Sequence, residues 1–139
     1  MREIEVDAEV TERIERFRPV LTEVAGLDPP DVDFGTAANT IMLRGLDLML
    51  VEFFSQLDQA TLQQSVELFY QKHPNCQPVE RLNVTKNQLA DVHVALSRRY
   101  PRPFFEFMFE MLKTNKWAEA RKRAEKLFRR DDIERNGEG

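Results

Sequence analysis

Cysteine is nearly absent from this sequence, with Cys76 as the only one among 139 residues. A single thiol excludes an internal disulfide framework and is typical of a reducing compartment, so we expect a cytoplasmic protein. The first residues lack the charged and then apolar segments of a secretory signal, and no apolar run is long enough to span a bilayer, so we expect no contact with a membrane. Glycine is also scarce, with five residues, which favours helices.

The patterns that typify catalytic and metal sites are missing as well. The chain has two histidines, no glycine-rich phosphate loop, no nucleophile elbow and no motif of paired carboxylates. His73, Cys76 and His93 do not have metal-ligand spacing, and a structural role is favoured for each of them. A nucleophilic pair of Cys76 with a histidine would require these side chains to meet in a cleft. The sequence therefore predicts a non-enzyme with no cofactor and no metal.

Acidic and basic side chains are distributed unevenly along the chain. The net charge is −4, but residues 113–130 contain eight basic side chains and two acidic ones. A basic segment on an acidic protein can bind an anion that the whole molecule would repel. The length of the chain suits one compact core, and a hydrophobic content of 42% argues against global disorder.

The chain begins with a pattern of period two. Apolar residues alternate with glutamates over residues 2–6, which predicts a short strand. Asp7 is placed to cap a helix over residues 8–25, whose apolar residues recur at helical spacing. Pro19 falls inside this helix and predicts a kink or a restart, because a proline removes one helical hydrogen bond.

A second helix is predicted over residues 37–56, with Thr36 as its cap. Its apolar side chains cover more than one face, and only Arg44, Asp47 and Glu52 are charged. A helix that is apolar nearly all round lies in a core or in an interface between chains. Since a strand and two such helices cannot bury their own apolar surface, we expect a homodimer. The predicted dimerisation residues are Ile4, Val6, Val10, Ile14, Ile41, Leu46 and Met49.

Four further helices are predicted from apolar periodicity and capping residues. Asp58 is placed to cap a third helix. Thr85 and Gln88 have the spacing of a capping box, which opens a fourth helix. Pro103 suits the first turn of a fifth helix that is rich in phenylalanine, and a sixth covers residues 116–130.

The opening residues MREIEVDAEV, with Ile14 one turn later, resemble the first strand and helix of ribbon-helix-helix proteins. They are similar to the oligomerisation segment of bacterial negative modulators of replication initiation. Residues 36–46 resemble the second helix of the same family. The resemblance implies a dimer with an antiparallel two-stranded ribbon, and a role in DNA binding and transcription regulation. The loop between the helices is longer than the family's, and Pro19 departs from its pattern.

The predicted fold is mainly α, with about six helices and one short N-terminal β-strand. Residues 1–56 would form a ribbon-helix-helix-like dimerisation unit, residues 57–130 a helical part packed on it, and residues 131–139 a flexible tail. In the ribbon, Glu3 and Glu5 would face the phosphate-lined groove and be repelled, so the ribbon is expected to dimerise without reading bases.

The leading functional hypothesis is therefore a dimeric DNA-associated regulatory or partition-type protein that contacts phosphates of duplex DNA through its last helix. The predicted contacts are Lys116, Arg121, Lys122, Arg123, Lys126, Arg129 and Arg130. A charge run of this kind is also typical of a solvated helix face. The alternative is a helical protein–protein adaptor or complex subunit that does not bind nucleic acid. Residues 104–112 are its candidate contact region, although such an aromatic run is also typical of a core.

Overall fold

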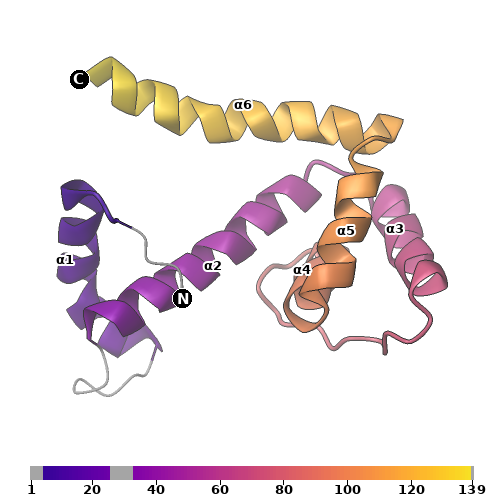
Figure 1. Cartoon of the computed structure of the whole chain (residues 1–139), viewed down its shortest axis with the longest axis horizontal. Coiled ribbons are helices and arrows are strands. Elements are labelled where there is room, and N and C mark those ends of the chain that lie inside the picture. Colours follow the sequence, from indigo (N-terminus) through magenta and orange to yellow (C-terminus); the bar gives the residue numbers. More distant parts are fainter. Residues whose placement is uncertain (1–4, 26–32, 139) are drawn as a thin grey trace. The chain divides into compact units, whose positions relative to one another are not determined.

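The computed structural model describes residues 5–25 and 33–138, and these residues form six helices and no strand (Figure 1). Side chains are described except at residues 24, 25, 128 and 130–138. The helices are α1 (Ala8–Ala25), α2 (Phe34–Phe54), α3 (Gln59–Lys72), α4 (Gln88–Arg99), α5 (Pro101–Met111) and α6 (Asn115–Glu138). The prediction of a mainly α fold is confirmed.

The strand predicted over residues 2–6 is not found in the described part of the chain. Residues 2–4, which include Ile4, lie outside it, and Glu5 and Val6 precede α1 without regular secondary structure. A strand requires a second strand to pair with, and the described residues offer none. The ribbon-helix-helix dimerisation unit therefore stays a prediction.

The chain divides into two compact units, residues 1–46 and residues 47–139, and the division falls inside α2. The boundary predicted at residue 56 thus lies within the second unit. The first unit consists of α1 and the first part of α2, and its core is small. Its buried apolar residues are Ile14, Leu21, Ala37 and Ala38, with Val10, Phe34 and Ile41 packed against them.

The two helices of the first unit differ from their predictions in detail. α1 runs through Pro19 as one helix, so no restart occurs there. Pro19 is exposed, and water can reach the backbone groups that a helical proline leaves unpaired. Asp33 caps α2, because its carboxylate accepts a hydrogen bond of 2.7 Å from the amide of Thr36. The prediction of Thr36 as the cap was wrong, since Asp33 reaches the Thr36 amide and starts the helix earlier.

The second unit has a continuous aromatic core. Within it α4 packs against both α3 and α5, and the start of α6 adds to the same cluster. Trp117, Phe54, Phe69 and Phe104 are fully buried there. Phe53, Phe54 and His93 surround the indole of Trp117, with ring centroids 5.7, 6.0 and 6.5 Å away. Packing of large rings accounts for most of the apolar burial in this unit.

Capping residues fix the helix starts of the second unit. Asp58 caps α3 as predicted, accepting a hydrogen bond of 2.7 Å from the amide of Thr61. α4 is capped by Asn87, which accepts from the amide of Ala90 at 3.1 Å. The capping box predicted from Thr85 was therefore wrong. α6 continues to Glu138, and the flexibility predicted for residues 131–139 stays a prediction.

Candidate functional site

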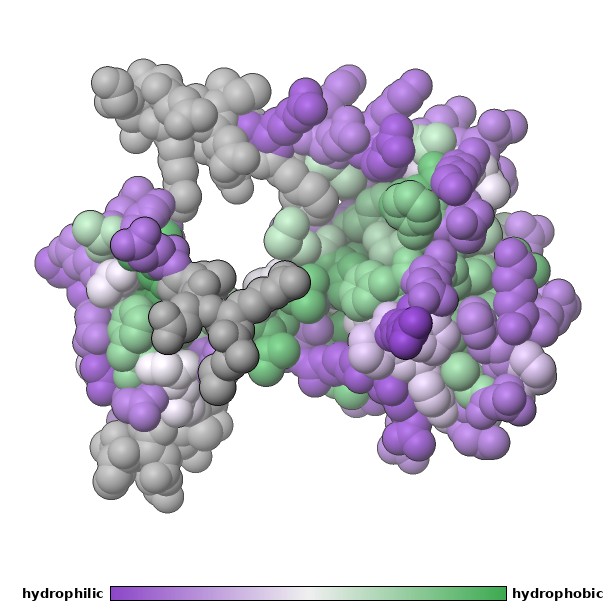
Figure 2. Space-filling view, viewed as in Figure 1, coloured by the Kyte–Doolittle hydropathy of each residue, from purple (hydrophilic) through white to green (hydrophobic). Residues whose placement is uncertain are grey.

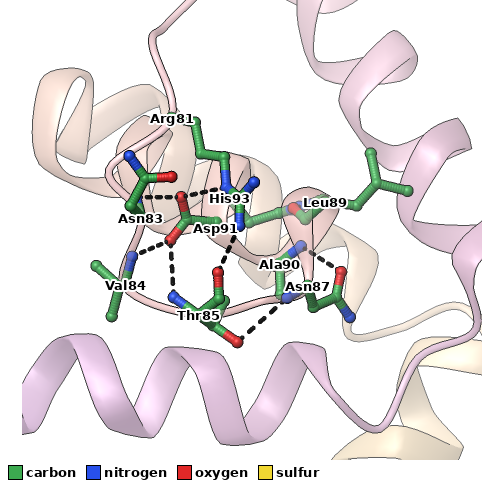
Figure 3. Close-up of polar contacts among 9 residues, drawn as sticks. All are labelled: Arg81, Asn83, Val84, Thr85, Asn87, Leu89, Ala90, Asp91 and His93. Atoms are coloured by element: carbon green, nitrogen blue, oxygen red, sulfur yellow. Dashed lines mark hydrogen bonds and ion pairs between the residues drawn. The ribbon is translucent and has the colours of Figure 1, made fainter.

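A buried carboxylate organises the loop before α4 (Figure 3). Asp91 is fully buried, and its oxygens accept hydrogen bonds from the amides of Asn83 and Val84 at 2.6 Å and of Thr85 at 3.3 Å. The Arg81 guanidinium donates to the same carboxylate at 3.2 Å and to the Thr85 carbonyl at 2.7 Å. Asn83 has a positive φ of 58°, and its amide donates to Asp91. With its acceptor sites occupied, this carboxylate holds a loop and has no room for a ligand.

His93 and Ser65 form a second buried polar pair. The Nδ1 atom of His93 lies 2.6 Å from the Leu89 carbonyl and Nε2 lies 2.9 Å from the Ser65 hydroxyl. A carbonyl can only accept, so Nδ1 carries the proton and Nε2 accepts from Ser65. Burial lowers the pKa of His93 to about 4, and the ring is therefore neutral at pH 7.

This pair has the geometry of a nucleophile and its base, but not its accessibility. Ser65 and His93 are both buried, and the imidazole packs 4.6 Å from the ring of Phe54. A catalytic serine must reach a substrate, and its base is oriented by a carboxylate where a triad exists, whereas here Leu89 supplies a backbone carbonyl. The pair joins α3 to α4 and is structural.

The other candidate reactive residues do not join this pair. His73 packs against the ring of Phe69, with centroids 5.0 Å apart, and Cys76 lies half-buried against the core. Two pockets of the second unit are lined by residues other than Ser65, His73, Cys76 and His93. Among residues 5–25 and 33–138, no group of three His, Cys, Asp or Glu side chains could hold a metal ion.

Three of the seven predicted phosphate contacts are engaged within the chain. The Lys116 amine lies 3.4 Å from the Asp58 carboxylate, and the Arg121 guanidinium lies 3.7 Å from Glu125. Arg123 donates to the Gln56 carbonyl at 2.6 Å. The amide of Thr61, and to a smaller extent Lys116, lowers the pKa of Asp58.

The other described basic residues of α6 point away from the core. Lys122, Lys126 and Arg129 are exposed at i, i+4 and i+7, opposite the face that buries Trp117 and Ala124. No ion pair is seen for these three within the described residues. The side chain of Arg130, also predicted to bind, lies outside the description. The predicted basic residues are therefore of two kinds: some contact other groups of the chain, and others are exposed to solvent.

Apolar side chains remain exposed along α2, and Figure 2 shows hydrophobic surface over its second half. They keep 46–63% of their area in contact with solvent, and they are Met42, Leu43, Leu46, Leu48 and Met49. The predicted dimerisation residues are divided between buried and exposed positions. Ile14 is buried in the first unit, Val10 and Ile41 pack on it, and Leu46 and Met49 are exposed.

The aromatic run at residues 104–112 is also divided. Phe104 and Phe107 belong to the core, whereas Phe105 and Phe109 are exposed. The exposed rings line an open pocket of about 800 Å³ on α5, together with Arg102 and other residues of that helix. Most apolar residues of this run therefore belong to the core, and the rings of Phe105 and Phe109 lie at the surface.

An ion pair that the sequence analysis missed joins α2 to α4. Asp47 is buried, and Arg98 donates to it through two nitrogens, with Nε 3.3 Å from Oδ1. This hydrogen bond raises the pKa of Arg98. The signal was present in the sequence, because an aspartate in an otherwise apolar helix segment must find a cation when it is buried.

Comparison of the chain with family models, curated proteins and solved structures finds no match. No helix in the described residues combines the length and the apolarity needed to cross a bilayer. The functional argument therefore depends on the surfaces described above.

Proposed function

We propose that this chain is a self-associating helical adaptor that acts through protein–protein contact on α2. The observation that carries the proposal is the exposure of Met42, Leu43, Leu46, Leu48 and Met49 on one helix. Exposed apolar surface that is contiguous and larger than a few hundred Å² typically marks an interaction site. The small core of the first unit supports the same proposal, because α1 and α2 leave much of their apolar surface unburied.

The size of the exposed surface suits a reversible dimer. Full burial of a leucine or methionine side chain contributes about 1.5–3 kcal/mol, so covering the exposed halves of five contributes on the order of 5 kcal/mol per chain. Two chains gain about twice this, which is comparable with the roughly 4–15 kcal/mol that association costs. We therefore expect a dimer whose population depends on protein concentration.

Sedimentation velocity over a range of concentrations tests the proposal. The wild-type chain should pass from monomer to dimer, and Leu46→Glu should shift it toward monomer, because a carboxylate in the interface loses its water. Leu127→Glu is the matched control, since Leu127 is exposed on α6 to 45%, similar to Leu46 at 48%. A wild-type chain that stays monomeric at every concentration would overturn the proposal.

A second candidate function is contact with duplex DNA, as the resemblance to ribbon-helix-helix proteins implies. Lys122, Lys126 and Arg129 support it, because they form an outward basic stripe on α6. Each phosphate that they neutralise steepens the dependence of affinity on salt. In an electrophoretic shift at low salt, replacing the three by glutamine should abolish binding, and replacing Lys116 and Arg121 should change it less. No shift with micromolar wild-type protein would end this candidate.

A further inference from the structure

A surface pocket of the second unit brings two arginines together with an apolar wall. The pocket holds about 500 Å³ and lies between the connector that joins α3 to α4 and the C-terminal half of α4. Val79 and Leu82 of the connector and Ala95 of α4 supply apolar surface, and Arg98 and Arg99 supply N–H donors. A volume of this size is typical of sites that bind small molecules.

The connector that forms one wall of the pocket is held in place by tyrosines. The amide of Val79 donates to the hydroxyl of Tyr70 at 3.1 Å, and the amide of Gln77 donates to the hydroxyl of Tyr100 at 2.8 Å. The buried carboxylate of Asp91 holds the following residues of the same connector. The wall is therefore formed before a ligand arrives, which lowers the entropy cost of binding.

Both guanidinium groups of the pocket are oriented by neighbouring side chains. Arg98 donates through Nε and Nη2 to the buried carboxylate of Asp47. Arg99 lies over the ring of Tyr100, 5.6 Å from its centroid, and its Nε donates to the Tyr100 hydroxyl at 3.3 Å. Within the described part of the chain, Nη1 of Arg98 and both terminal nitrogens of Arg99 have no hydrogen-bond partner. A guanidinium held in this way is suited to binding a carboxylate.

The charges around the pocket favour a ligand that carries both signs. Asp47 already compensates Arg98, so the remaining charges are those of Arg99 and of Glu80, which is exposed and also lines the pocket. No ion pair of Glu80 is found among the described residues. Glu80 would repel a simple anion, and Arg99 would repel a simple cation.

We infer that this pocket binds a free apolar α-amino acid. Its carboxylate accepts hydrogen bonds from Arg98 and Arg99, its ammonium group pairs with Glu80, and its side chain packs against Val79 and Leu82. Each feature of the pocket then has a counterpart in the ligand. The inference concerns the second unit alone and does not depend on the proposed self-association.

NMR titration of the isotope-labelled chain at pH 7 tests the inference with three compounds of one carbon skeleton. These are leucine, isocaproate, which lacks the ammonium group, and isopentylamine, which lacks the carboxylate. Leucine should shift the amide resonances of Val79 and Arg99 in a saturable way. Each analogue should bind at least about tenfold more weakly, because it leaves one charged group of the pocket without its counterpart. No saturable shift with leucine, or equal binding of either analogue, would overturn the inference.

Arg99→Gln tests the contact with the carboxylate. The dissociation constant for leucine should rise about tenfold or more, because hydrogen bonds to a charged group are lost. Arg102→Gln is the matched control, since Arg102 is an exposed arginine of α5 outside this pocket, and it should leave the constant unchanged. Because Arg99 is exposed, the thermal midpoint should change little. Unchanged binding of leucine by Arg99→Gln would show that the site is not here.

Leu82→Ala tests the apolar wall. Leu82 is 38% exposed, so its truncation should not unfold the chain. Binding of leucine should weaken roughly fivefold through lost apolar contact, whereas free glycine, which has no side chain, should bind weakly and equally to both chains. If Leu82→Ala prefers leucine over glycine as strongly as the wild-type chain does, the side chain of the ligand does not lie on this wall and the inference fails.

Discussion

The two units of this chain differ in what fills their cores. In the second unit Phe54, Phe69, Phe104 and Trp117 are fully buried among one another. The first unit buries Ile14, Leu21 and two alanines, and no aromatic ring is among its fully buried residues. Large rings supply much more buried apolar area than alanines do, so most of the folding free energy of the chain resides in the second unit.

This difference has a meaning for function. Two buried carboxylates of the second unit are satisfied within the chain, Asp91 by its loop and Asp47 by Arg98. The first unit and the middle of α2 leave apolar side chains in water. A region that cannot complete its own core is the region where a partner gains most by binding. If the proposed self-association holds, we expect the second unit to supply most of the stability and the surface on α2 to supply the association.

The largest effect is expected from Phe54→Ala, which tests whether the second unit holds the stability. The ring contacts His93 and Trp117, and its removal leaves a cavity that should lower the free energy of unfolding by about 3–5 kcal/mol. Urea denaturation measures the change. Phe109→Ala removes an exposed ring of α5 and should change it by less than about 1 kcal/mol. Equal losses in both variants would contradict a tightly packed core.

Acid should destabilise the second unit through His93. Its pKa is about 4 in the folded chain and near the ordinary 6.5 in the unfolded chain, so the unfolded chain binds more protons between these values. The contribution of neutral His93 is fully present above pH 6.5 and falls as the pH is lowered, by up to about 3 kcal/mol at pH 4. Urea denaturation of the wild-type chain and of His93→Gln at several pH values gives the slope of the free energy of unfolding against pH, and the difference between the two slopes is the contribution of His93. Identical slopes would show that His93 is not buried.

A smaller effect is expected from Leu21→Ala, which tests the first unit. The core of this unit is small and can relax around the substitution. The free energy of unfolding should therefore fall by about 2 kcal/mol, which is at the lower end for a buried leucine. Since a partner would stabilise this region by mass action, the midpoint of unfolding should depend on protein concentration. Circular dichroism melts at low and high concentration measure this. A fall in the free energy of unfolding as large as that expected for Phe54→Ala would indicate a larger core than the one described.

The smallest effect is expected from Lys116→Gln. Its ion pair with Asp58 is exposed on both sides, and water and salt screen such a pair. Thermal denaturation in low and high salt should therefore give nearly the same midpoint for the variant and the wild-type chain. A larger change would mean that Lys116 also orients the start of α6.

Most helices could be predicted because local patterns determine them. The apolar repeat of α4 and the cap at Asp58 are both properties of neighbouring residues. The strand at residues 2–6 depended on a pairing partner, which a local period of two cannot supply. The cap of α4 was misassigned because Asp91, within the helix, draws the amide of Thr85 away from capping geometry.

Surfaces were less predictable than helices. The apolar composition of α2 indicated burial or an interface, but could not show that Leu50 and Phe54 are buried while Leu46 and Met49 are not. Likewise, the basic run of α6 did not show that Arg123 would bind the Gln56 carbonyl. Both outcomes depend on contacts between residues far apart in the sequence. Charge and hydropathy alone do not encode those contacts.

The loop held by Asp91 has a consequence for hydrogen exchange. Amides of an irregular segment normally exchange quickly, because water reaches them during small fluctuations. The amides of Asn83, Val84 and Thr85 all donate to a carboxylate that is fully buried on α4. They can exchange only when the loop separates from that helix. In a deuterium-exchange map this loop should therefore be protected to a degree that matches α4, although it contains no secondary structure of its own.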